Sequence, residues 1–92
     1  MVGVARLELH MPENGSLKDK RRIVRSLLDR LRSRFNVAAA EVERQDRWDA
    51  AVLALVCVSN EAAHVDAMLT EIVGWVDAQT HGRLVRVERE FR

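Results

Sequence analysis

The feature that most constrains this chain is a segment of 20 residues, 16–35, that is apolar on one helical side and basic on the next. Its apolar residues recur at steps of three and four, which is the spacing of one helix face: Leu17, Val24, Leu27, Leu28, Leu31 and Phe35. Ser16 is a good N-cap because its hydroxyl can accept a hydrogen bond from an unpaired backbone N–H, and Asp19 follows three residues later. The segment therefore predicts one long helix whose apolar side covers a small sheet.

The same predicted helix gathers most of the positive charge. Between Lys18 and Arg34 there are eight basic and two acidic residues, which gives +6, and since the whole chain carries +1 the rest carries −5. The candidate phosphate-binding residues are Lys18, Lys20, Arg21, Arg22, Arg25 and Arg32. Four of these lie in the first two turns, where the helix dipole favours acids and each base costs about 0.3–1 kcal/mol. Two interpretations stay open: an ordinary solvated helix face, or a surface that binds phosphate groups.

The rest of the sequence predicts a second helix and four strands. The predicted order is strand 2–11, helix 16–35, strand 37–45, strand 48–59, helix 60–76 and a last strand after the turn at Gly82. Asn36 is expected to end the first helix in the left-handed conformation, and Asn60 to cap the second. This order predicts one α+β domain over residues 1–92, a ferredoxin-like βαββαβ sandwich with a four-stranded antiparallel sheet and two helices on one face. The alanines of 37–45 would also permit a helix there.

The segment 48–59 is the most apolar part of the chain, and both of its faces are apolar. A strand of this kind is covered on both sides, yet helices cover only one side in the expected architecture. The other side is therefore expected to meet a partner, most simply a second copy of the chain. The candidate partner-binding residues are Trp48, Val52, Ala54 and Val56. For Trp48 two interpretations stay open, a plug at the end of the core or an exposed hairpin anchor.

Several classes of function lack support in the sequence. His10, His64, His81 and Cys57 are scattered without metal-ligand spacing, so no metal and no cofactor are expected. There is no glycine-rich phosphate loop and no serine flanked by glycines. The first and third strands have no aromatic residue in their interiors, which argues against stacking of RNA bases on the open sheet. The chain is therefore not expected to be an enzyme.

The expected location is the cytoplasm. The lone Cys57 cannot form an internal disulfide, which fits a reducing compartment. The sequence has no apolar run long enough to span a membrane and no signal-peptide pattern, so no membrane association is expected.

The start and the end of the first predicted helix also resemble a known family. The matching stretches are Ser16-Leu17-Lys18-Asp19-Lys20-Arg21-Arg22, Phe35-Asn36-Val37, Ala40-Glu41-Val42, Asp46, Trp48, Val58-Ser59-Asn60 and His64-Val65. On these residues the chain resembles the YlxP-like family, a bacterial family of unknown function. The resemblance implies a ferredoxin-like fold, and it makes Lys18, Lys20, Arg21 and Arg22 the family-typical basic cluster. Genes of the family often lie beside translation and ribosome-maturation factors, which implies an RNA or ribosome setting, and no catalytic residues carry over.

Three functional hypotheses follow. The first is a non-enzymatic module that binds RNA or a ribosomal subunit through phosphate contacts, motivated by the basic helix. Its weakness is the net charge of +1, which is low for a nucleic-acid-binding domain. The second is a structural or protein-interaction module that forms a homodimer through the open side of the sheet. The third is a small-anion or metabolite sensor at the start of the first helix, with Lys20 and Arg21 near Ser16.

Overall fold

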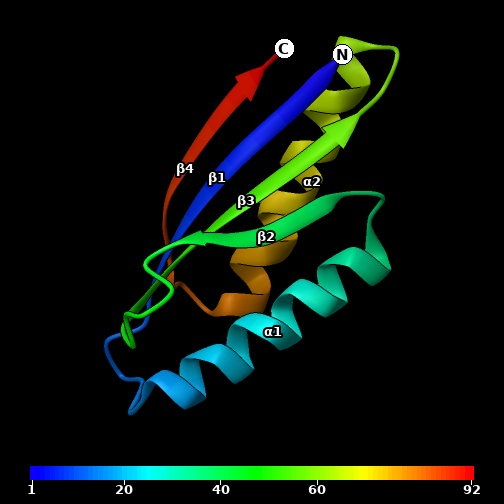
Figure 1. The fold of residues 1–92 in the computed structure, drawn as a ribbon. Coiled ribbons are helices and arrows are strands. Elements are labelled where there is room, and N and C mark those ends of the chain that lie inside the picture. The colour runs from blue at the N-terminus through cyan, green and yellow to red at the C-terminus, as the bar shows by residue number, and fades with distance from the viewer.

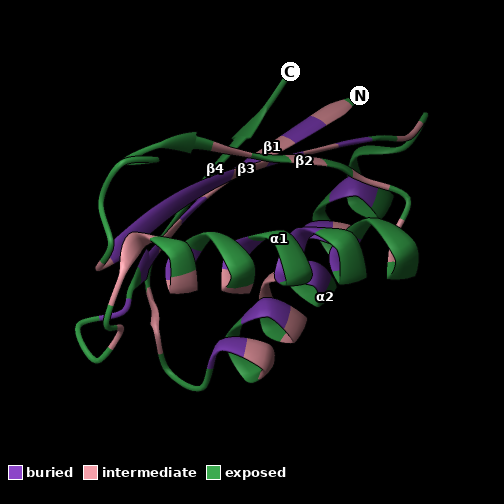
Figure 2. Ribbon diagram, turned by 60° about the horizontal axis from the view of Figure 1, so that its bottom comes forward, coloured by how far each residue is buried: buried purple, intermediate pink, exposed green.

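The computed structural model describes residues 1–92 and contains six helices and strands in the predicted order (Figure 1). These are β1 (Val2–His10), α1 (Leu17–Arg34), β2 (Ala38–Glu43), β3 (Ala50–Val58), α2 (Ala62–Thr80) and β4 (Leu84–Phe91). The four strands form one antiparallel sheet in the order β2-β3-β1-β4. Both helices lie on the same side of this sheet (Figure 2). The predicted ferredoxin-like α+β fold is therefore confirmed, and neither helix is long and apolar enough to cross a membrane.

The core lies between the sheet and the two helices. Along β1 every second residue is buried, and the register places Leu7 opposite Leu53 and Ala5 opposite Leu55. The helices contribute their apolar stripes to the same cluster: Val24, Leu27, Leu28 and Leu31 from α1, and Val65, Leu69, Ile72 and Val76 from α2. Figure 1 shows α1 along the β2 edge of the sheet and α2 behind the central strands. One layer of helices thus buries one face of the sheet and leaves the other face open.

Helix α2 packs so close to Gly3 of β1 that no side chain fits between them. A Cβ atom placed there would lie 2.3 Å from Cγ1 of Val65 and 3.1 Å from Cδ1 of Leu69. Real Cβ atoms do not approach a neighbouring carbon this closely, so a hydrogen is the only substituent that fits between β1 and α2. The absence of a side chain at this position therefore sets how near α2 approaches the sheet.

The ends of the helices agree with the sequence in part. Ser16 caps α1 as predicted, since its Oγ accepts the backbone N–H of Asp19 at 3.1 Å. The prediction for Asn36 is wrong, because Phe35 is already extended (φ −123°) and leads the chain directly into β2. The prediction for Asn60 is also wrong. Helix α2 begins one residue later, after Glu61, whose backbone N–H donates to Oγ of Ser59 at 3.3 Å.

The hairpin between β2 and β3 turns over residues 44–49, close to the boundary predicted between the strands 37–45 and 48–59. Arg44 adopts a positive φ of 59°, and the N–H of Arg47 donates to the carbonyl of Arg44 at 3.0 Å. Trp48 follows in this loop and is 47% exposed, so it does not plug the core. Its backbone carbonyl accepts the side-chain N–H of Asn14 at 3.0 Å, which joins this hairpin to the loop before α1.

Candidate functional site

The outer side of α1 presents a continuous row of cations to solvent. We call the exposed side chains of Lys18, Arg21, Arg22 and Arg25 the basic face. They border a shallow hollow formed by α1 alone, without any hydrophobic lining residue, together with Asp19, Ser26, Asp29 and Arg30. Figure 2 shows that much of α1 consists of exposed residues. The apolar stripe of α1 faces the sheet, so the helix rotation that buries the stripe also turns these cations outward.

Three of these cations have no internal partner. Lys18, Arg21 and Arg25 make no hydrogen bond and no ion pair within the chain. Arg22 contacts Asp19 at 3.4 Å while 77% exposed, a contact that adds little in water. An exposed guanidinium or ammonium group without a carboxylate is free to bind an anion from solution.

Arg32 lies about two helical turns beyond Arg25, the last residue of the basic face, and is only partly free. It contacts Asp29 at 3.6 Å and also donates to the backbone carbonyl of Ala39 in β2. Beside it runs a narrow groove between α1 and β2, with Arg21 and Arg25 on its rim and Val24, Leu28 and Glu41 among its lining residues. Arg32 therefore holds the end of α1 against the sheet edge, and the structure places it beside the basic face rather than within it.

Lys20 does not belong to this surface, and its predicted role as a phosphate ligand is wrong. Its side chain is 0% exposed, and its Nζ donates to the carbonyls of Arg44 (2.8 Å), Gln45 (3.2 Å) and Ala50 (3.1 Å). The Glu41 carboxylate lies 2.7 Å from the same nitrogen. The three N–H groups of the Lys20 ammonium donate to these three carbonyls. Oε2 of Glu41 therefore forms an ion pair with Lys20 but accepts no hydrogen bond. Lys20 is thus a neutralised buried cation that ties α1 to the β2–β3 hairpin.

The anion site predicted at the start of α1 is not assembled. It required Lys20 and Arg21 to converge near Ser16. The Ser16 hydroxyl already accepts the Asp19 N–H, Lys20 turns into the protein and Arg21 turns to solvent. The helix start therefore keeps a single exposed cation of the pair, which is a poor basis for a small-anion sensor.

The four residues predicted to bind a partner do not form one patch. Val52, Ala54 and Val56 lie on the open sheet face, the side away from the helices, but Val52 is 0% exposed. Trp48 lies in the hairpin loop at the other end of β3, about 25 Å from Val56 at the usual rise of a strand. Ala54 and Val56 share the open sheet face with the apolar residues Val4, Val42 and Val58.

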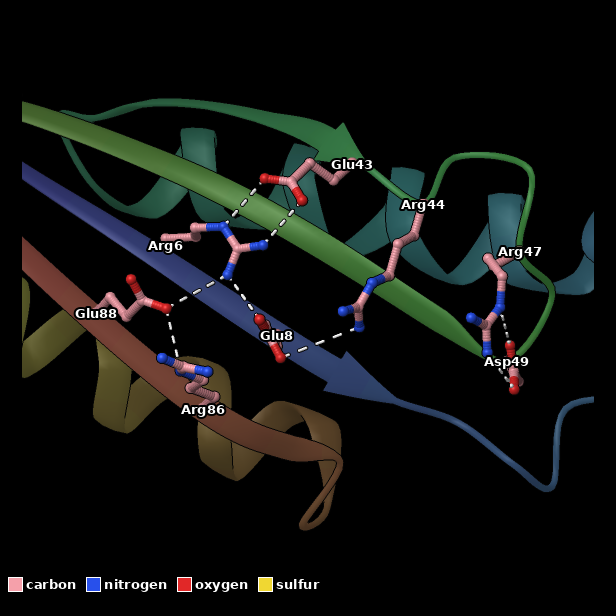
Figure 3. A network of polar contacts seen from close by, with 8 residues as sticks. All are labelled: Arg6, Glu8, Glu43, Arg44, Arg47, Asp49, Arg86 and Glu88. Atoms are coloured by element: carbon pink, nitrogen blue, oxygen red, sulfur yellow. Dashed lines mark hydrogen bonds and ion pairs between the residues drawn. The ribbon is translucent and has the colours of Figure 1, made fainter.

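Val52 pairs in the sheet with Glu8 on one side and Glu43 on the other. Both acids belong to a network of charged side chains that sequence reasoning missed (Figure 3). Arg6 donates to both carboxylate oxygens of Glu43, at 3.2 and 2.9 Å, and to Glu8 at 2.6 Å. Glu88 lies 3.5 Å from Arg6 and 3.0 Å from Arg86 of β4. Arg44 lies 4.0 Å from Glu8 and completes the network. The alternation of charges in β1 and β4 was visible in the sequence, but the register that brings them together was not.

The network shifts the titration of its acids. The hydrogen bonds from Arg6 hold the pKa values of Glu8 and Glu43 below their usual range, because they stabilise the charged carboxylates. The same bonds raise the pKa of Arg6. Three arginines and three glutamates therefore neutralise one another on this side of the sheet, in contrast to the basic face of α1.

The remaining chemically versatile side chains give no reactive centre. No group of three or more His, Cys, Asp or Glu side chains is placed to hold a metal ion. Cys57 is buried in the core, and burial raises the pKa of its thiol, which disfavours the reactive thiolate.

Two comparisons with known proteins cover nearly the whole fold. A protein-family model described as "Protein of unknown function (DUF503)" matches residues 2–89. The "Uncharacterized protein YlxP" of Bacillus subtilis (strain 168) is 30% identical over 78 residues, which are 85% of each chain. Both agree with the resemblance drawn from the residues around α1. Neither description states an activity.

Proposed function

The chain belongs to the DUF503 family of proteins of unknown function, and we propose that it is a non-enzymatic module that binds structured RNA, such as ribosomal RNA, through phosphate contacts to the basic face of α1. The observation that carries the proposal is the set of three exposed cations without internal partners, Lys18, Arg21 and Arg25. Phosphate groups are the natural ligands of such a row, because guanidinium groups bind phosphate oxygens in pairs and lysine supplies a point charge.

The distribution of charge supports this assignment more than its total does. The chain carries only +1, but α1 carries +6 and the open sheet face is close to neutral. An RNA surface is attracted to α1 and gains nothing from the other faces, so the charge pattern orients the protein as well as binding it. Contacts of this kind release counterions and do not depend on base sequence.

Binding to ribosomal RNA by the wild-type chain and a triple variant tests the proposal. In Lys18→Ala/Arg21→Ala/Arg25→Ala we expect the affinity at low salt to fall at least about 30-fold, since three phosphate contacts are lost. The matched control is Arg47→Ala/Arg83→Ala/Arg92→Ala, which removes the same charge from positions outside α1 where each arginine has a carboxylate partner. We expect the control to lose less than about threefold. Equal losses in both variants, or no RNA binding at low salt by the wild type, would overturn the proposal.

The proposed location is the cytoplasm, where ribosomal RNA is found and where the unpaired Cys57 would remain a thiol.

A second candidate function is self-association through the open sheet face, with another copy of this chain as the partner. The supporting observation is the apolar strip of Val4, Val42, Ala54, Val56 and Val58, of which Val58 is 65% exposed. The neighbouring charges are balanced, so two copies can bring these faces together without net repulsion, whereas two basic faces repel each other. Sedimentation equilibrium tests this: we expect a dimer that Val58→Asp dissociates, and a wild-type monomer at high micromolar concentration contradicts it.

A further inference from the structure

We infer that the aromatic and arginine side chains at the C-terminal end of α1 form a binding site for an unpaired RNA base. This inference rests on the proposed function and adds the class of RNA that the protein prefers. The site consists of Arg30, Arg34, Phe35 and Trp75, which we call the base site.

The first observation is where the few aromatic residues lie. The chain has two Trp, two Phe and no Tyr, and one of each meets here. The rings of Phe35 and Trp75 pack edge to face, with centroids 5.7 Å apart. The Arg30 guanidinium lies 5.8 Å from the centre of the Trp75 ring, and that of Arg34 lies 5.7 Å from the centre of Phe35. Aromatic rings flanked by arginines are the arrangement on which RNA-binding proteins stack unpaired bases.

The second observation is a hollow that opens over this cluster. Its lining residues come from both helices: Arg30, Ser33, Arg34, Trp75 and Gln79. Trp75 is the one hydrophobic residue among them and is only half-buried, so its ring forms the apolar wall. Arg30 also borders the hollow on the basic face. The two hollows therefore form one surface, which runs about 18 Å along α1 from Lys18 to Arg30 and ends at an aromatic ring.

The third observation is that neither arginine is neutralised. Arg30 donates to the Gln79 side chain at 2.6 Å and to the Ser26 carbonyl at 3.3 Å, both uncharged acceptors. Arg34 makes no ion pair. By themselves these contacts are a clamp between α1 and α2, and that is the alternative explanation of the cluster. However, stacking of a base on tryptophan is stronger than an exposed cation–π contact, so a base can displace the guanidinium from the ring. The displaced Arg30 then pairs with the adjoining phosphate.

The geometry selects among RNA structures. Bases of a regular duplex are stacked within the helix and cannot reach Trp75, whereas a single strand, a bulge or a strand end can turn a base outward. The basic face binds the backbone of either form. The site therefore favours single-stranded or bulged RNA over a continuous duplex of equal charge.

Tryptophan fluorescence tests this directly, because Trp48 can be replaced by Phe to leave Trp75 as the single reporter. Trp48 lies in the β2–β3 hairpin, which contacts the start of α1 through Lys20, whereas Trp75 contacts Phe35 at the end of α1. In Trp48→Phe we expect a 12-nucleotide single strand to quench the fluorescence, and a hairpin duplex with the same number of phosphates to bind without quenching. Trp75→Leu should then lose about 5- to 100-fold in affinity for the single strand and less than twofold for the duplex. Trp75→Phe, which keeps a ring, should recover most of the loss.

Arg34→Gln keeps the inference testable if Trp75→Leu fails to fold, because Arg34 is exposed and outside the core. This variant should lower the affinity for the single strand several-fold more than the affinity for the duplex. Salt-dependent binding of both RNAs without quenching of Trp75, or equal losses for both RNAs in these variants, overturns the base site and leaves the proposed function intact. If neither RNA binds at low salt, the proposed function fails and the base site fails with it.

Discussion

At the scale of single residues, Lys20 shows that a basic side chain on a basic helix can serve the fold instead of a ligand. It comes two residues after the exposed Lys18, yet the helix turns it to the opposite side, under the β2–β3 hairpin. Its charge is compensated by Glu41 and by the carbonyls of Arg44, Gln45 and Ala50. Removing one partner of such a buried pair leaves the other charge without compensation, which is the costly case.

We therefore predict that Lys20→Met lowers the free energy of unfolding by about 3–5 kcal/mol, a large part of the stability of a small domain. Lys18→Met is the control and should change it by less than about 0.5 kcal/mol, since Lys18 is exposed and unpaired. The double variant Lys20→Met/Glu41→Leu should recover more than half of the loss, because no buried charge remains. Urea denaturation measures all three, and equal effects at the two lysines would contradict a structural role for Lys20.

Arg6 gives a prediction about pH. Its hydrogen bonds hold the pKa values of Glu8 and Glu43 below their usual range in the folded state. Between the folded and the unfolded pKa the unfolded chain binds more protons, so this stabilisation is complete above the ordinary glutamate pKa and is lost as pH falls through the lower folded values. Arg6→Gln should therefore be less stable than wild type at pH 7, and the difference should shrink toward pH 3.

Urea midpoints measured from pH 7 to pH 3 check this expectation. Arg21→Gln is the control, because Arg21 has no acidic partner and its effect on stability should not follow the same pH dependence. A deficit of Arg6→Gln that is as large at pH 3 as at pH 7 would show that Arg6 acts by packing on the sheet, and not through the two carboxylates.

At the scale of elements, the two helices meet the sheet in different ways. Helix α1 lies along the β2 edge and keeps a wide side free for ligands, while α2 packs closely on the central strands at Gly3 (Figure 1). A single glycine determines this second contact, because Val65 and Leu69 occupy the space that a side chain would need. Val65 is β-branched and fully buried, so it cannot move aside without strain.

The same substitution at two glycines should have opposite effects. We predict that Gly3→Ala lowers the free energy of unfolding by about 1–3 kcal/mol through overpacking. In contrast, Gly74→Ala on the exposed side of α2 meets no atom within 4 Å and should raise stability by about 0.4–1 kcal/mol, because alanine favours a helix and restricts the unfolded chain. Thermal and urea unfolding of both variants tests the close approach of α2. A Gly3→Ala variant with the same free energy of unfolding as wild type would rule out this close approach.

At the scale of the whole molecule, the fold places charges in three distinct environments. The outer side of α1 carries exposed cations, the open sheet face carries balanced charges beside an apolar strip (Figure 3), and the interior holds one buried cation, Lys20. A net charge of +1 thus conceals a strongly polar distribution of charge. Because binding of phosphates by such a surface releases counterions, its strength depends on salt in proportion to the number of contacts.

The proposed function therefore predicts how steeply the RNA association constant falls as the salt concentration rises. With four cations of the basic face in contact, the logarithm of the RNA association constant should fall by about 3 to 4 for each tenfold rise in salt. The variant Lys18→Ala/Arg21→Ala/Arg25→Ala should reduce this slope by about 2 to 3. Filter binding at graded salt concentrations measures it, with Arg47→Ala/Arg83→Ala/Arg92→Ala as the control of unchanged slope. An identical slope in wild type and the α1 variant would place the contacts elsewhere.

The sequence by itself was enough for the pattern of elements and for much of their detail. The three-and-four spacing predicted both helices, the alternation in residues 2–11 predicted β1 with its buried side, and the serine before the basic run predicted the cap of α1. All of these depend on residues a few positions apart, so helix and strand geometry alone connect them to structure. The outward direction of Lys18, Arg21, Arg22 and Arg25 follows from the same periodicity.

What only the tertiary structure decided depends on residues far apart in the chain. Lys20 meets the carbonyl of Ala50 from 30 positions away, and Arg6 meets Glu43 from 37. Phe35 and Trp75 come together only because α1 and α2 pack side by side on one face of the sheet. Such contacts are set by strand register and by how the helices pack, and local periodicity carries no information about either. The fate of each cation, whether it is buried, neutralised or free to bind, was therefore decided by packing and not by its place on a helical wheel.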